Sequence, residues 1–190
     1  MPVSARPVTP GRRSSRSAAR MMSVTRDARD RDPAGRPRQA RPRDEMGRPL
    51  PYGDPRGVEP VPEEPLPAAE ALALAQSLLD TGRAFAAHEV LEAAWKAAPD
   101  DERDLWQGLA QICVGITHAQ RGNRAGAVRL LDRGAGRLHR YAADPPHGID
   151  VSGVLAWYSA NAGDPAAADP PRLSPGRPDA QHGQCPHTSR

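Results

Sequence analysis

The chain has 190 residues, of which 26 are Lys or Arg and 23 are Asp or Glu, so its formal net charge is +3. Proline and glycine contribute 22 and 17 residues, whereas aromatic side chains make up only 4%. This composition excludes a well-packed core along the whole length. No run of 18 uninterrupted apolar residues occurs, which argues against a membrane protein. Two cysteines without a partner at metal-ligand spacing suit a reducing cytoplasm, which is the compartment we expect.

Composition divides the chain into three segments. Residues 1–64 hold 14 Arg and 11 Pro but almost no long apolar side chains, so they are expected to form a disordered arm. Residues 162–190 are rich in Pro, Ala, Asp and Gly, which predicts a disordered tail. Residues 65–161 hold all three Trp and the one Phe. We therefore expect this middle segment to be the folded domain.

The middle segment is predicted to be helical, because no stretch of it alternates apolar and polar residues as a half-buried strand does. Helix limits follow from Pro near a first turn, Asn or Asp as N-cap, and Gly or Pro after a last turn. Short connections favour antiparallel neighbours, so the expected fold is all-α, a compact bundle of about five helices. The expected helices run from Pro67 to Asp80, from about Arg83 to Ala98, from after Glu102 to Arg121, from Asn123 to about Tyr141, and from Asp150 to about Ser159.

Polar side chains fall on the inward faces of two neighbouring predicted helices. His88 and Glu92 lie one turn apart within the apolar face of the second helix, and Gln107 and Gln111 do the same on the third. A buried polar group without a partner costs on the order of 1–3 kcal/mol. The two stripes are therefore expected to face each other or to line a pocket. The candidate pocket comprises His88, Glu89, Glu92, Trp95, Gln107, Gln111, His118, Arg121 and Asn123.

Two interpretations of this pocket compete. His88 and Glu92 present two ligands to one point, and His118 could complete a divalent metal site with a position open for water. The other interpretation is a hydrogen-bond network in which Glu92 orients His88 and the two glutamines close the network. We favour the network, and no catalytic residue is assigned.

Basic residues elsewhere have simpler explanations. Arg121 and Asn123 are most simply a helix stop and an N-cap, although Arg121 could also hold an anion beside the free N–H groups of the next helix. The arginines from Arg129 to Arg140 form a line opposite the apolar stripe of their helix, which is typical of a solvated face. The arm could bind RNA by charge, but its nine acidic residues and few aromatics make a poor stacking platform.

These motifs resemble those of a known family. Phe85–Trp95, Gln107–Gln111, His118–Asn123 and Pro146–Asp150 occur in the order found in DUF309, a family of domains of unknown function. The Arg- and Pro-rich stretch from Arg31 to Gly53 is similar to an extension of actinobacterial members. The resemblance covers roughly Pro65 to Ser159. It implies an all-helical domain and no particular activity.

The sequence thus predicts an uncharacterised helical domain that binds a partner or ligand through the polar pocket between its second and third helices. One alternative is a metal-dependent, hydrolase-like enzyme using His88, Glu92 and His118. Another is an RNA-associated protein acting through the arm. Whether the protein is an enzyme stays open. A divalent metal is the one cofactor suggested, and a protein is favoured as partner over nucleic acid.

Overall fold

The computed structural model describes residues 41–174, and of these residues 42–174 belong to one compact unit. Within the described residues there are five α-helices and no strand, which confirms the all-α prediction. Each predicted helix is present, with ends within one turn of those expected. The helices are α2 (Ala68–Asp80), α3 (Ala84–Ala97), α4 (Arg103–Gln120), α5 (Arg124–Leu138) and α6 (Val151–Asn161), with 3₁₀ turns at His139–Tyr141 and Pro146–Gly148.

Local signals set the helix ends. Gly82 and Gly122 have φ angles of +77° and +78°, a conformation that costs glycine little, and they follow the ends of α2 and α4. Asn123 and Asp150 are the N-caps of α5 and α6. Each side chain accepts a hydrogen bond from the backbone N–H three residues further on, at 2.9 and 2.8 Å respectively. Both predicted caps are therefore confirmed.

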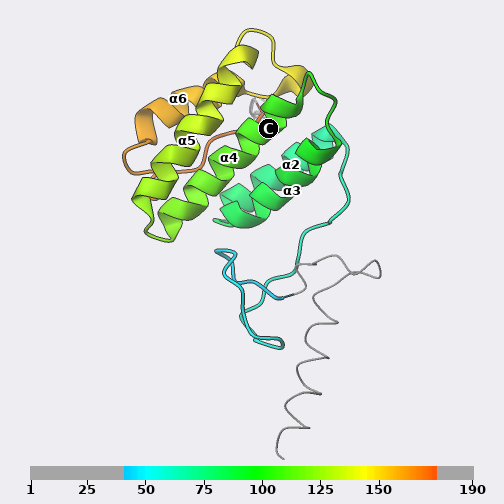
Figure 1. Ribbon diagram of the computed structural model, residues 1–190, viewed down its shortest axis with the longest axis vertical. Helices are drawn as coiled ribbons and strands as arrows, with labels where there is room; N and C mark the ends of the chain where they lie inside the picture. The colour runs from blue at the N-terminus through cyan, green and yellow to red at the C-terminus, as the bar shows by residue number, and fades with distance from the viewer. Residues whose placement is uncertain (1–40, 175–190) are drawn as a thin grey trace, which may run out of the picture. The chain divides into compact units, whose positions relative to one another are not determined.

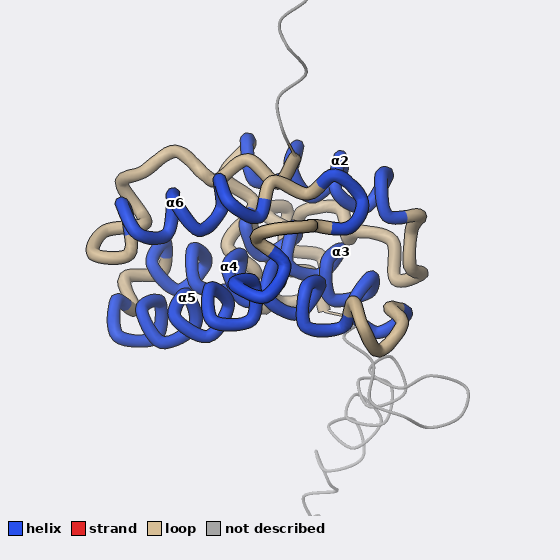
Figure 2. The backbone as a smooth tube through the Cα atoms, turned by 90° about the horizontal axis from the view of Figure 1, so that it is seen from above, coloured by secondary structure: helices blue, strands red, loops and turns tan. Residues whose placement is uncertain are grey.

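The helices lie in two layers, as Figure 2 shows. One layer contains α3, α4 and α5, and the other contains α2 and α6. Figure 1 shows α4 between α3 and α5, and its Leu105, Leu109 and Ile112 have no exposed surface. A helix that is apolar on most sides occupies the centre, as its sequence indicates. Of the helices in the described residues, none is long and apolar enough to cross a membrane.

Residues on both sides of the helices are also buried. Leu173 has no exposed surface, and Leu50 exposes 7%. The Leu173 N–H donates to Gln76 Oε1 at 2.7 Å, and the Leu173 carbonyl accepts from the Asp150 N–H at 2.9 Å. Residues 41–64 and 162–174, which the composition assigned to arm and tail, thus contribute buried side chains. The predictions for residues 1–40 and 175–190 lie outside the described residues.

Candidate functional site

His88 and Glu92 contact each other on α3, as their spacing predicted. His88 Nε2 is 3.4 Å from one carboxylate oxygen of Glu92, and the other oxygen is 2.9 Å from Lys96 Nζ. The side chains of His88 and Glu92 are 20% and 33% exposed. The pair therefore lies at the edge of the core, where solvent reaches part of it.

Burial shifts the pKa values of two groups on α3, His88 and Glu89. Desolvation lowers the pKa of His88 below its ordinary value, and the Glu92 carboxylate opposes this shift. Desolvation raises the pKa of Glu89, with Arg43 opposing it. His88 is therefore a neutral imidazole near pH 7, and Glu89 is a carboxylate that solvent stabilises poorly.

Several polar groups on this part of α3 and α4 have unused hydrogen-bonding capacity. The interactions of the half-buried Glu89 carboxylate are electrostatic: Arg43 and Arg83 attract it, and Glu92 repels it. His88 Nδ1 and Gln111 Oε1 are buried without a hydrogen-bond partner. The glutamines therefore do not close the network around His88 and Glu92 that the stripes suggested. The physical reason is that these side chains are only half-buried, so packing does not force them to bond one another.

The remaining polar candidates lie where α4 ends and α5 begins. His118 Nδ1 is 2.9 Å from the side-chain nitrogen of Asn123, whose oxygen caps α5. Because the capping bond fixes the orientation of this amide, its NH₂ donates to His118 Nδ1, and the proton of a neutral His118 is on Nε2. Asn123 therefore has the capping role predicted for it, and His118 shares that turn.

A three-ligand metal site does not form from these residues. His118 is bonded to the α5 cap, whereas His88 and Glu92 pair with each other further along the face. Among the residues that the structure describes, no group of three or more His, Cys, Asp or Glu side chains is arranged to hold a metal ion.

A loop of residues 42–58 covers one end of α3 and α4. Its Gly47 lies so close to Phe85 that an added Cβ would overlap the phenyl ring. Arg121 Nε donates to the Met46 carbonyl at 2.8 Å, and the Arg121 guanidinium carbon is 5.4 Å from the centre of the Phe85 ring. Arg121 therefore holds this loop, a role that the sequence did not suggest.

Arg43 is a second residue that the sequence analysis missed. Its guanidinium carbon is 4.9 Å from the centre of the Phe85 ring, and its NH1 donates to the Gly47 carbonyl at 2.6 Å. The Gly-Arg-Pro step at Gly47 is the one local sign of a turn. Nothing near it in the sequence identifies Phe85 as the surface it contacts.

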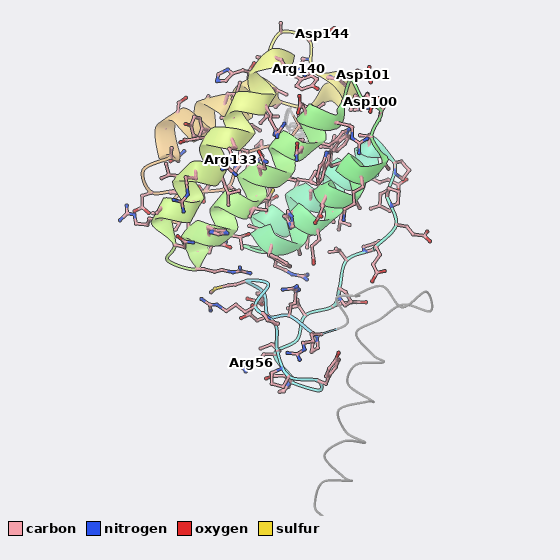
Figure 3. The ribbon with its side chains drawn as sticks, viewed as in Figure 1. Arg56, Asp100, Asp101, Arg133, Arg140 and Asp144 are labelled. Carbon is pink, nitrogen blue, oxygen red and sulfur yellow. The ribbon has the colours of Figure 1, made fainter. Side chains whose placement is uncertain are left out.

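Trp95 and the arginines beyond α4 have structural roles. Trp95 is partly buried against the core. Arg140 NH1 is 2.9 Å from Asp104 Oδ2, and Arg137 pairs with the other Asp104 oxygen. Figure 3 shows Arg133 on α5 and Arg140 just beyond the helix. The predicted arginine line is thus an exposed face in which two members are ion-paired.

Comparison with known proteins relates part of the helical region to one family. Residues 72–130 match the family model "Domain of unknown function (DUF309)". The region from α2 into α5 is therefore similar to DUF309. The matched residues, 72–130, include all nine candidate residues.

A curated relative is similar to part of the chain. The chain is 44% identical over 48 residues to the uncharacterized protein YpuF of Bacillus subtilis (strain 168), a stretch that spans 25% of this chain and 28% of YpuF. No solved structure matches the chain significantly.

Proposed function

We propose that the helical domain is a binding module, and that it holds a basic side chain of a protein partner on the polar face of α3 and α4. The α3–α4 face is defined here by His88, Glu89 and Glu92 of α3 and by Gln107 and Gln111 of α4. The observation that carries the proposal is the unused hydrogen-bonding capacity of this face, above all the Glu89 carboxylate.

The chemistry of these groups favours a cationic ligand. A guanidinium or ammonium group carries only donors, and a half-buried carboxylate is its strongest acceptor. Desolvation raises the pKa of Glu89, so a cation that replaces the lost water stabilises the charged form. His88 is neutral at pH 7 for the same reason and does not repel such a cation. An anionic ligand would meet Glu89 and Glu92 instead.

A protein partner fits better than catalysis. Glu92 is already paired with Lys96 at 2.9 Å, and His118 is bonded to the α5 cap. Glu92 contacts His88 at 3.4 Å, but its carboxylate is shared with Lys96, and within the described residues no third His, Cys, Asp or Glu side chain joins the pair to hold a metal ion. A binding role needs only that the face be half-exposed and polar, and these side chains are all half-buried.

The test is an NMR titration of the full-length protein with four tetrapeptides that differ at one position, which is Arg, Lys, Gln or Leu. We expect the Arg and Lys peptides to shift the backbone amides of α3 and α4, and the Leu peptide to leave them unchanged. Glu89→Gln should weaken binding of the Arg peptide by about tenfold, because a charge-assisted hydrogen bond contributes roughly 1.5–3 kcal/mol.

Glu70→Gln is the matched control, since Glu70 is exposed in the first turn of α2. It should leave peptide binding unchanged. Equal shifts with all four peptides, or equal weakening by both substitutions, would contradict the proposal. If only deletion of residues 1–40 made the Arg peptide bind, the chain's own arginine-rich arm would be the occupant instead of a partner.

A further inference from the structure

A proline-containing segment of the chain is bound by side chains of α2 and α6. We call residues 169–174 the C-terminal segment; it follows α6 and is coloured orange to red in Figure 1. Trp157 Nε1 donates to the Asp169 carbonyl at 2.6 Å. Gln76 Nε2 donates to the Pro171 carbonyl at 3.4 Å, while Gln76 Oε1 accepts from the Leu173 N–H at 2.7 Å. The helices thus hold the backbone of this segment through side chains.

These contacts follow the pattern by which proteins bind extended proline-rich peptides. Pro170 and Pro171 fix their φ angles and lack N–H groups, so the segment is extended and leaves carbonyls to be bound. Grooves lined by aromatic side chains bind such segments in other proteins, and here Trp157 supplies the aromatic side chain beside Pro170. Leu173, with no exposed surface, is the apolar anchor. The recognised pattern is therefore Pro-Pro-x-Leu.

The groove is larger than the segment within it. A cavity of about 480 Å³ lies along α2 beside Arg172 and Ser174. A second cavity of about 220 Å³ lies between Gln120 of α4 and the chain around Pro170, and Gln120 Oε1 is buried without a partner. Hollows on both sides of the segment mean that it forfeits part of the contact energy of a close-packed core.

We propose that the groove between α2 and α6 is a recognition site for an extended Pro-Pro-x-Leu segment. The C-terminal segment occupies it in cis, and a partner protein that carries the same motif replaces it. Because the C-terminal segment is tethered to α6, its effective concentration at the groove is in the millimolar range. The same motif on another protein therefore competes only when the C-terminal segment binds more weakly or when the other protein is present at high concentration. This inference does not rest on the function proposed for the α3–α4 face.

The test uses fluorescence polarisation with a labelled peptide of residues 166–174. The full-length protein and its Leu173→Asp variant are titrated against it. We expect the variant to bind the peptide about tenfold more tightly than the wild type, because its own anchor no longer fills the site. A peptide with Asp in place of its leucine should not bind. Adding Trp157→Phe to the variant should weaken binding, since the indole donor is lost.

A second variant covers the case in which Leu173→Asp unfolds. Pro171→Gly keeps the anchor but makes the free segment more flexible, so it favours release, and we expect a smaller gain in peptide binding. Absence of any gain with Pro171→Gly would overturn the proposal. So would loss of helical circular dichroism with both variants, which would make the segment a permanent part of the core. A concentration-dependent dimer that excludes the peptide would also overturn it, because a second copy would then be the occupant.

Discussion

The spacing of residues on one helix was enough to predict the contact between His88 and Glu92. An i, i+4 pair is a property of helix geometry and needs no knowledge of the fold. The unpaired Gln111 could not be predicted in this way. Its surroundings depend on how α3 and α4 are rotated about their axes, which the apolar residues between them decide. The sequence thus predicted the pair on one helix but not the hydrogen bonds between the two helices.

Substitution of the two charged neighbours of His88 should move its pKa in opposite directions. The Glu92 carboxylate raises the pKa of His88, and the Lys96 ammonium lowers it. Glu92→Gln should therefore lower the pKa further, and Lys96→Gln should raise it. NMR titration of the His88 ring protons in the full-length protein measures both. Shifts of the same sign would contradict the charge assignment at this site.

The lowered pKa of His88 also makes stability depend on pH. The unfolded chain has a histidine pKa of about 6.5, and the folded value is lower. Protons then bind the unfolded state preferentially as the pH falls below about 6.5, so this contribution to stability is lost on acidification through the folded pKa. Replacing His88 with Gln removes the effect, while Glu89, Glu92, Lys96 and Arg43 stay in place.

Urea unfolding of wild type and His88→Gln between pH 7.5 and pH 5 checks this expectation. The free energy of unfolding should fall more steeply with decreasing pH in the wild type. A parallel pH dependence in the two proteins would show that His88 titrates with its ordinary pKa.

At the scale of the helices, prediction succeeded where the signal is local. Gly82, Gly122, Asn123 and Asp150 mark helix ends through their own backbone preferences or capping side chains. The loop of residues 42–58 was missed, because its contact joins Gly47 to Phe85 across a long stretch of chain. The mean composition of the arm could not predict the contact with Phe85, because that contact depends on the single residue Gly47.

The packing of α4 against α5 depends on glycine. A Cβ at Gly134 would lie 2.9 Å from the Gly108 carbonyl oxygen, whereas a Cβ at Gly136 would meet nothing within 4 Å. Gly134→Ala should therefore destabilise the fold by about 1–3 kcal/mol through overpacking. Gly136→Ala should stabilise it by about 0.5–1 kcal/mol, because alanine favours a helix more than glycine does. Urea denaturation compares the two, and equal effects would mean that the helices separate freely.

The loop contact has an equally direct test. Gly47 and Gly53 both have positive φ, +73° and +82°, but only Gly47 touches another side chain. Gly47→Ala should release the loop, and amide hydrogen exchange at Leu50 and Val58, whose N–H groups bond within the loop, should accelerate. Gly53→Ala imposes only the backbone strain and should accelerate exchange less. Equal acceleration would mean that the Phe85 contact does not hold the loop.

At the scale of the whole molecule, segment composition did not reveal that Leu50 and Leu173 are buried. Segment composition predicts burial from the mean apolar content of the segment. A single leucine among prolines changes that mean very little. Leu173 is nevertheless fully buried, because Gln76 and Asp150 fix the backbone on either side of it. The boundary of this domain is therefore set by a few long-range contacts.

Truncation measures what those contacts contribute. We expect a chain of residues 42–174 to match the full-length protein in urea midpoint. A chain of residues 65–161 should stay helical but be less stable by about 2–5 kcal/mol, the usual cost of losing a buried leucine's contacts. At the lower end of that range, about one molecule in thirty would release the C-terminal segment at any moment, enough for a partner to capture it. Equal urea midpoints for the two truncated chains would mean that the C-terminal segment adds no stability. Its burial could not then compete with the binding of a partner in the groove.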